Sequence, residues 1–209
     1  MTTLNPSTGL FIVFEGGDAV GKTTQMRMLV PWLRERGVDP VVTRQPGGTS
    51  LGRKLRKLLL GPDHPELVSR AEALIYAADK AQHVEELIRP ALTEGQVVVC
   101  DRYVDSMIAY QGAGRVLDLA EVEQVARWAT GGLRPDLTVL LDADPADAVA
   151  TIRQQDRLEA AGLDFHRRAR EHFLRLASQA PDRYLVLDAR ESREAIAQQV
   201  AARVGSLIA

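Results

Sequence analysis

Apolar residues along this chain follow two patterns, short continuous runs and longer stretches with helical spacing. Five short runs have the length and the β-branched content of buried strands. Their apolar residues do not alternate with polar ones, so we expect helices to cover both faces of their sheet, as in parallel sheets. The five runs lie at 10–14, 41–43, 96–101, 137–142 and 184–188.

Helical spacing fills the segments between these runs. Residues 22–36 carry apolar side chains three and four positions apart, and the pattern stops before Gly37. It predicts a helix, and Pro31 within it predicts a kink. Alternating strands and helices predict an α/β fold with one five-stranded parallel sheet flanked by helices in three layers. Further helical patterns run through 51–59, 122–128 and 196–207.

Two segments begin with candidate capping residues. Ser69 is followed three positions later by Glu72, which predicts a capping box at the start of a helix that ends at Pro90. Asp118 and Glu121 form a second possible cap before the pattern at 122–128. In each case a side chain would satisfy backbone N–H groups that have no partner within the helix.

A glycine-rich loop joins the first apolar run to the first helix. Strand, glycine-rich turn and helix together are typical of a phosphate-binding P-loop, although a chance match in a tight turn is the alternative. We expect Lys22 to contact the outer phosphates and Thr23 to ligate Mg²⁺. A carboxylate among phosphates is costly, so Asp18 should face a second ligand. The expected nucleotide contacts are Gly16, Gly17, Asp18, Ala19, Val20, Gly21, Lys22 and Thr23.

The third run ends in Asp101, and a carboxylate at that position after a P-loop predicts a second Mg²⁺ ligand. Arg102 follows at the end of a strand where ligands bind in open α/β sheets, so we expect it to contact phosphate. Arg153 and Arg157 lie one helical turn apart after the fourth run. Because the P-loop contains no arginine, we expect these two to form a lid that closes over the phosphates.

The overall composition limits the class of protein. A chain of 209 residues with 45% hydrophobic and 26% charged residues fits one globular domain. Its net charge of −2 argues against a dedicated nucleic-acid binder, and no apolar stretch approaches a membrane span. The single cysteine, Cys100, excludes an internal disulfide and lies in an apolar run, so we expect a core residue in a cytoplasmic protein.

Several motifs together resemble the thymidylate kinase family. They are residues 14–24, 44–49, 77–84 and 101–112, and residues 156–159 with 165–166 resemble the lid of the bacterial members. The resemblance covers nearly the whole chain in order, and 101–112 is its most specific part. It implies a single P-loop nucleoside monophosphate kinase domain over 1–209, with a lid at about 150–165. It also implies a homodimer that transfers the γ-phosphoryl group of MgATP to dTMP, giving dTDP for dTTP synthesis.

The same resemblance implies individual roles. Asp18 would hold the sugar 3′-hydroxyl, Tyr76 would stack on thymine and Gln111 would read the base edge. Tyr110 would pack against the deoxyribose and disfavour a 2′-hydroxyl. The implied dTMP contacts are Asp18, Arg56, Tyr76, Lys80, Arg102, Tyr110 and Gln111; the implied catalytic charges are Lys22, Arg102, Arg153 and Arg157; and the metal ligands are Thr23 and Asp101.

Three positions depart from the family pattern, and all concern the acceptor. Gln45 replaces the usual Glu, Lys80 replaces a common Arg and so loses the bidentate fork, and Met107 replaces Ser or Asn. A kinase for another acceptor therefore stays open as an alternative. A GTP-dependent switch is less favoured because the chain lacks an Asn-Lys-x-Asp segment. The intact Lys22, Thr23, Asp101 and Arg102 argue against a nucleotide-binding protein that has lost catalysis.

Overall fold

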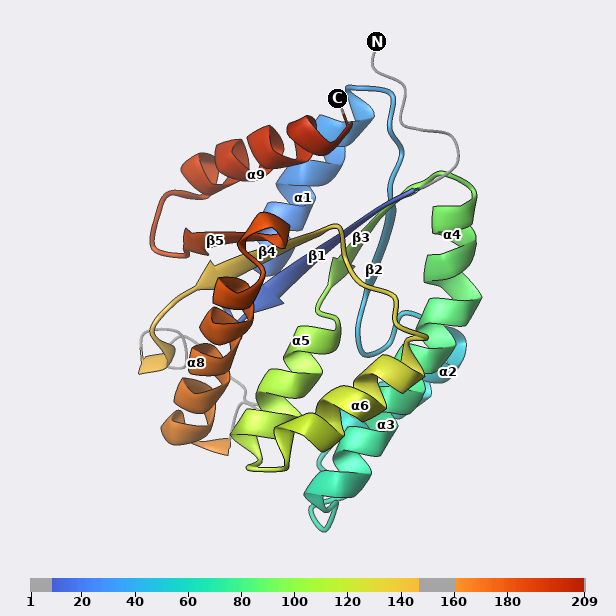
Figure 1. The fold of residues 1–209 in the computed structure, drawn as a ribbon, viewed down its shortest axis with the longest axis vertical. Helices are drawn as coiled ribbons and strands as arrows, with labels where there is room; N and C mark the ends of the chain where they lie inside the picture. The colour runs from blue at the N-terminus through green and yellow to red at the C-terminus, as the bar shows by residue number, and fades with distance from the viewer. Residues whose placement is uncertain (1–8, 147–160, 209) are drawn as a thin grey trace.

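The sheet has the predicted number and direction of strands. The computed structural model describes residues 9–146 and 161–208. Five strands form one sheet in the order β2-β3-β1-β4-β5, and every neighbouring pair is parallel (Figure 1). The strands are β1 (Leu10–Gly16), β2 (Val41–Arg44), β3 (Val97–Asp101), β4 (Leu137–Asp142) and β5 (Tyr184–Asp188). The predicted α/β class is confirmed.

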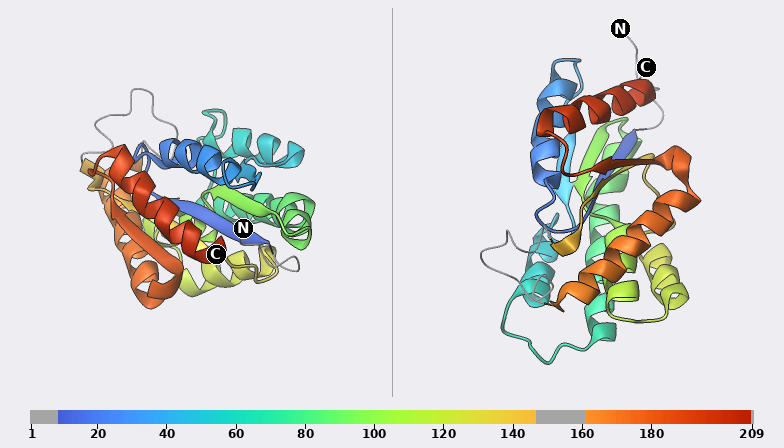
Figure 2. Two further views of the ribbon diagram at one scale, coloured as in Figure 1. Left: turned by 90° about the horizontal axis from the view of Figure 1, so that it is seen from above. Right: turned by 90° about the vertical axis from the view of Figure 1, so that its left-hand side faces the viewer.

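Helices cover both faces of this sheet (Figure 2). Alternate residues of β1 point to opposite faces, so Ile12 and Phe14 pack with α1 and α9, whereas Phe11 and Val13 pack with η1 and α4. The helical elements are α1 (Lys22–Arg34), α2 (Ser50–Leu60), α3 (Ser69–His83), η1 (Val84–Ile88), α4 (Arg89–Thr93), α5 (Val104–Met107), η2 (Ile108–Gly114), α6 (Leu119–Ala129), α8 (Leu163–Gln179), η4 (Pro181–Arg183) and α9 (Arg193–Ile208). Within the described ranges, no helix is long and apolar enough to cross a bilayer.

A further apolar core lies between α3, η2, α6 and α8. It includes Tyr110, Phe165 and Phe173, whose rings contact one another around Tyr110. These helices extend past the end of the sheet toward which β1 points (Figure 1). They therefore form walls beside the loop that follows β1, where ligands bind in open α/β folds.

Two local predictions about α3 were wrong. Ser69 is the first residue of α3 rather than its cap, because Val68 is the N-cap and gives no side-chain hydrogen bond. Glu72 is instead buried and hydrogen-bonded to η2. Pro90 does not end the helix: α3 continues through the π-helical turn η1 into α4, whose second residue is Pro90.

The other predicted cap is confirmed. Asp118 is the N-cap of α6, and its carboxylate accepts a hydrogen bond of 2.9 Å from the backbone N–H of Glu121. The first helix, α1, runs through Pro31 and ends at Arg34, two residues before the predicted end. Cys100 is fully buried in β3, and burial raises the pKa of its thiol well above the usual value, in keeping with a core residue.

Candidate active site

The predicted P-loop connects β1 to α1. Gly16 has φ 127° and Gly21 has φ 99°, both in the region that favours glycine. A Cβ on Gly16 would lie 2.3 Å from the carbonyl oxygen of Leu141, so the loop also approaches β4 closely. Gly21 is the N-cap of α1 and supplies no side-chain cap. The first N–H groups of α1 are therefore not capped by a side chain, as an anion site at a helix N-terminus requires.

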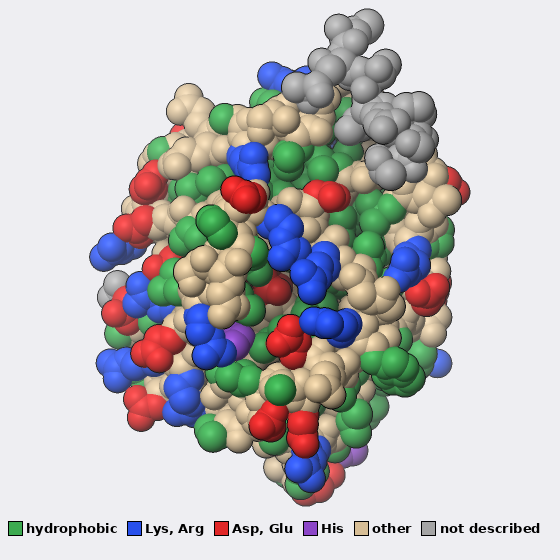
Figure 3. All heavy atoms as spheres, viewed as in Figure 1, with side chains coloured by type: hydrophobic (Ala, Val, Ile, Leu, Met, Phe, Trp, Pro, Cys, Tyr) green, Lys and Arg blue, Asp and Glu red, His purple; other side chains and the backbone are tan. Residues whose placement is uncertain are grey.

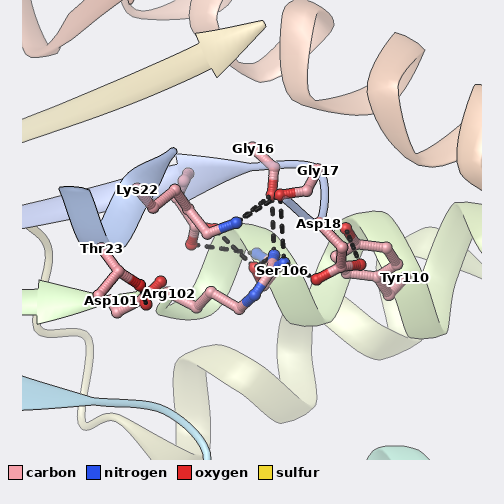
Figure 4. Close-up of polar contacts among 10 residues, drawn as sticks. Gly16, Gly17, Asp18, Lys22, Thr23, Asp101, Arg102, Ser106 and Tyr110 are labelled. Atoms are coloured by element: carbon pink, nitrogen blue, oxygen red, sulfur yellow. Dashed lines mark hydrogen bonds and ion pairs between the residues drawn. The ribbon is translucent and has the colours of Figure 1, made fainter. Parts of the chain in front are cut away.

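Lys22 turns back over this loop. Its side chain is buried, and Nζ donates to the carbonyl oxygens of Gly16, at 3.2 Å, and Gly17 (Figure 4). Burial, aided by the charge of Arg102, lowers the pKa of Lys22 to about 8. The ammonium is thus positively charged at neutral pH and held at the loop where phosphate is expected.

Thr23 and Asp101 come together at the ends of α1 and β3. The Thr23 Oγ1 atom lies 3.5 Å from Asp101 Oδ2, and Asp101 Oδ1 is buried with no hydrogen-bond partner among the described residues. An orphaned buried oxygen beside a hydroxyl fits a small oxygen-loving cation. No group of three His, Cys, Asp or Glu residues forms a metal cage in the part of the chain that the structure describes. The donor set therefore suits Mg²⁺ held mainly by phosphates and water.

Arg102 leaves β3 in a left-handed conformation, with φ 66°. Its guanidinium donates to Gly16 O at 2.9 Å and to Ser106 Oγ at 3.0 Å, and it lies 5.2 Å from the centre of the Tyr110 ring. It also forms an ion pair with Asp18 (Figure 4). These contacts hold a positive charge between the P-loop and the helical layer.

Asp18 belongs to the P-loop but faces the helical layer. Its carboxylate pairs with Arg102 and accepts a hydrogen bond from the Tyr110 hydroxyl at 3.4 Å. Burial opposes ionisation, but the charges of Arg102 and Lys22 outweigh it and hold the pKa of Asp18 below its usual value. Asp18 thus presents a carboxylate to the cavity beside it.

That cavity, the Tyr76 cavity, has a volume of about 530 Å³ and lies between the P-loop, α2, α3 and η2. Tyr76 and Gln111 are buried in its wall, and Gln45, Pro46 and Met107 also line it. All seven residues that the resemblance assigned to dTMP line this one cavity: Asp18, Arg56, Tyr76, Lys80, Arg102, Tyr110 and Gln111. Its lining of aromatic rings with a few charged and amide groups suits a small-molecule ligand.

Glu15, which the sequence analysis did not single out, fixes the segment that carries Arg102. Its fully buried carboxylate accepts hydrogen bonds from the backbone N–H of Tyr103, at 2.7 Å, and of Ser106, at 3.2 Å, and from the Ser106 hydroxyl. It therefore sets the position of the turn after β3. An acid at the end of an otherwise apolar strand was the signal that could have identified it.

Glu72 is a second residue whose role the sequence analysis did not identify. Its carboxylate accepts hydrogen bonds from Gln111 Nε2 at 2.9 Å and from Arg115 NH2 at 3.2 Å. Glu72 is fully buried, so these contacts compensate a charge removed from water. The hydrogen bond from Gln111 to Glu72 fixes the amide of Gln111 in the wall of the Tyr76 cavity.

The remaining predicted site residues are Arg56, Arg153 and Arg157. The Arg56 NH1 atom donates to Pro46 O at 3.0 Å, beside the Tyr76 cavity. Arg153 and Arg157 lie outside the described residues.

On the face viewed in Figure 1, Lys and Arg side chains lie among Asp and Glu side chains rather than in one block of a single charge (Figure 3). That distribution differs from the basic face of a nucleic-acid binder.

Comparisons with known proteins point to one family. The sequence model described as thymidylate kinase matches residues 14–200. The thymidylate kinase of Cutibacterium acnes is 58% identical over 200 residues, which cover 96% of this chain and 98% of that protein. The thymidylate kinase of Clavibacter sepedonicus is 54% identical over 208 residues and 97% of each chain. The crystal structure of thymidylate kinase from Ehrlichia chaffeensis is 31% identical, with a TM-score of 0.78 over 95% of this chain and 99% of that one.

Proposed function

This chain belongs to the thymidylate kinase family, and we propose that its P-loop and the Tyr76 cavity are the donor and acceptor sites of the family's reaction. The enzyme is an ATP-dependent nucleoside monophosphate kinase that phosphorylates dTMP to dTDP in dTTP synthesis. One observation carries the site assignment: Asp18, a P-loop residue, faces the Tyr76 cavity and pairs there with Arg102. The two proposed sites thus meet at a shared charged pair.

The donor site in this proposal is the loop Gly16–Thr23. Lys22 contacts the outer phosphates of ATP, and the N-terminus of α1 faces the same anion. Thr23 and Asp101 would hold Mg²⁺, to which Asp101 Oδ1, without a hydrogen-bond partner among the described residues, is suited. When bound, this ion would neutralise charge on the phosphates.

The acceptor site in this proposal is the Tyr76 cavity. Tyr76 stacks on thymine, Gln111 reads the base edge and Tyr110 packs against the deoxyribose, whose 3′-hydroxyl binds Asp18. Positive charge also lines the cavity, and we assign the 5′-phosphate to Arg56, Lys80 and Arg102. A lining that combines aromatic and cationic side chains suits a ligand with an aromatic group and an anionic group.

Transfer then depends on positioning and charge. The acceptor is a phosphate oxygen that is already ionised at neutral pH, so no general base is required. Lys22 and Arg102 stabilise charge on the moving phosphoryl group. We assign the same role to Arg153 and Arg157 in a lid at about 150–165, within a single domain that spans 1–209.

We also propose a homodimer in the cytoplasm. The support for the dimer is an unusual exposure of large apolar side chains on α2, α3 and α6, with Trp128 84% exposed and Leu74 59% exposed. Leu51, Leu55 and Leu58 form a stripe along α2 at helical spacing. A second copy of the chain covers these helices in this proposal. The single cysteine supports the cytoplasmic location.

Acceptor profiling tests the proposed sites. A coupled ADP-release assay with MgATP would compare dTMP, dUMP, dCMP, dGMP, AMP and thymidine. We expect strong preference for dTMP over dCMP and purine nucleotides, because the cavity wall holds the fixed amide of Gln111 and the ring of Tyr76. Equal use of a purine monophosphate would contradict the assignment of Tyr76 and Gln111, and no ADP release with dTMP would contradict the donor and acceptor sites together.

A further inference from the structure

A chain of buried polar side chains runs behind the wall of the Tyr76 cavity. The ammonium of Lys80 donates to Gln45 Oε1 at 3.0 Å. The other end of the same amide, Gln45 Nε2, lies 2.9 Å from His83 Nδ1, and His83 Nε2 lies 2.7 Å from Thr43 Oγ1. Lys80 and Gln45 are each 2% exposed, and His83 is fully buried.

Only one direction of hydrogen bonds satisfies this chain. Lys80 has donors and no acceptor, so the amide of Gln45 must present its oxygen to Lys80. The NH₂ group of Gln45 then faces His83, and Nδ1 must accept. The ring proton is therefore on Nε2, which donates to Thr43 Oγ1. His83 is thereby assigned as the neutral Nε2–H tautomer.

The surroundings of His83 maintain this state. Burial, with the charge of Lys80 acting in the same direction, lowers the pKa of His83 to about 4, so the ring is neutral at neutral pH. A Cβ on Gly48 would lie 2.3 Å from His83 Nε2, so the glycine loop packs directly on the ring. The imidazole therefore has neither the charge nor the space to change partners.

Reversing the Gln45 amide would have a definite cost. Its NH₂ group would then face the ammonium of Lys80, and two donors would oppose each other where both are buried. Lys80 would have to leave the position that lines the cavity. Gln45 and Lys80 line the Tyr76 cavity, whereas His83 does not.

We propose that His83 is a positioning residue for acceptor binding: by accepting from Gln45 it fixes the amide so that Gln45 Oε1 holds the Lys80 ammonium at the cavity wall. This inference deepens the proposed function, since it rests on Lys80 binding the 5′-phosphate of dTMP. Gln45 and Lys80 stand where the family pattern has Glu and Arg, and the amide, unlike a carboxylate, needs a neighbour to orient it.

A double-mutant cycle tests the proposal. His83→Leu removes the acceptor, and we expect the KM for dTMP to rise about tenfold, with kcat and the KM for ATP changing by less than about twofold. In a Gln45→Glu background the carboxylate presents an oxygen to Lys80 in either orientation. There His83→Leu should change the KM for dTMP by less than about twofold relative to Gln45→Glu alone.

The outcomes separate positioning from packing. An equal rise in KM in both backgrounds would mean that His83 only fills space, and no rise in either would mean that Gln45 orients itself; both results overturn the inference. His64→Leu, on an exposed loop residue, is the matched control and should leave the kinetics unchanged. If His83→Leu does not fold, His83→Asn replaces it: its amide oxygen can accept from Gln45, so the KM for dTMP should stay near wild type, and a tenfold rise would overturn the inference.

A further variant separates this inference from the proposed function. Lys80→Met removes the ammonium and should raise the KM for dTMP about tenfold or more. Unchanged KM in Lys80→Met would show that the proposed acceptor contact is wrong. A raised KM in Lys80→Met together with an unchanged KM in His83→Leu would leave the acceptor site intact and remove only the positioning role.

Discussion

Gln111 donates a hydrogen bond of 2.9 Å from its amide nitrogen to the carboxylate of Glu72, across the contact between η2 and α3. Both side chains are buried, and Glu72 also binds Arg115. A carboxylate only accepts, so it fixes which end of the Gln111 amide carries nitrogen. The amide oxygen is left to accept at the cavity that Gln111 lines, and it matches the N3–H donor of thymine rather than the N3 acceptor of cytosine.

Gln111→Leu therefore removes the readout of the base and leaves Glu72 short of a donor. We expect kcat/KM for dTMP to fall about 100-fold, and the preference for dTMP over dCMP to shrink, because a site built around a polar contact discriminates through it. Steady-state kinetics with both acceptors measure this. Gln124→Leu on the exposed side of α6 is the control; a dTMP-to-dCMP ratio unchanged in Gln111→Leu would show that Gln111 does not read the base.

Lys22→Ala removes the ammonium from the P-loop. We expect kcat to fall about 1,000-fold, because the lost charge acts on the phosphates during transfer, while the dissociation constant for dTMP changes by less than about threefold. Rapid-quench kinetics and calorimetry with dTMP measure the two effects. Lys54→Ala, on exposed α2, should turn over normally. Near-normal turnover in Lys22→Ala would contradict the donor-site assignment.

The parts of the site that sequence predicts are those with local signals. The P-loop has its glycines, lysine and threonine in one stretch, and β4 and β5 coincide with the predicted runs 137–142 and 184–188 because each strand is a short, mainly apolar segment. The only local signal of Glu15 is its position as an acid at the end of an apolar strand, and Glu72 and His83 have no such signal. Their hydrogen-bond partners lie 91, 39 and 38 positions away, at Ser106, Gln111 and Gln45, so their roles depend on the packed fold.

The error at the start of α3 has the same origin. The spacing of Ser69 and Glu72 matches a capping box, but the Glu72 carboxylate is buried and accepts hydrogen bonds from Gln111 and Arg115. Two long-range charge-assisted bonds outweigh one local cap, because the cap contributes only about 1 kcal/mol. The three departures from the family pattern were visible in the sequence, but only the packed structure relates Gln45 and Lys80 to His83.

Acid should destabilise the protein partly through His83. The folded pKa of about 4 lies below the unfolded value of 6.5, so its contribution is present above pH 6.5 and is lost as pH falls toward 4. We expect the difference in unfolding free energy between wild type and His83→Leu to shrink by about 2 kcal/mol from pH 7 to pH 5. Urea denaturation of both proteins at the two pH values measures this difference in unfolding free energy. The other titrating groups are the same in both proteins, so their contributions cancel in the difference. A difference independent of pH would mean that His83 is not a buried neutral histidine.

A charge at the proposed dimer face should separate the subunits. Trp128→Glu places a carboxylate where the proposal buries an indole, and we expect the dimer dissociation constant to rise at least about 100-fold. Sedimentation equilibrium measures it. Val186→Glu, at an exposed position of β5, is the control and should not change association. A monomeric wild type would contradict the homodimer, and an unchanged constant in Trp128→Glu would place the interface elsewhere.

The most direct test of the two assigned sites is a crystal structure with dTMP and a non-hydrolysable ATP analogue. The account predicts thymine against Tyr76 with its edge on Gln111, the 3′-hydroxyl on Asp18, and the 5′-phosphate facing Arg102 and Lys80. The triphosphate should lie along Gly16–Thr23, with its end toward the same arginine. Thymine bound outside the Tyr76 cavity, or a 5′-phosphate directed away from the P-loop, would contradict the account.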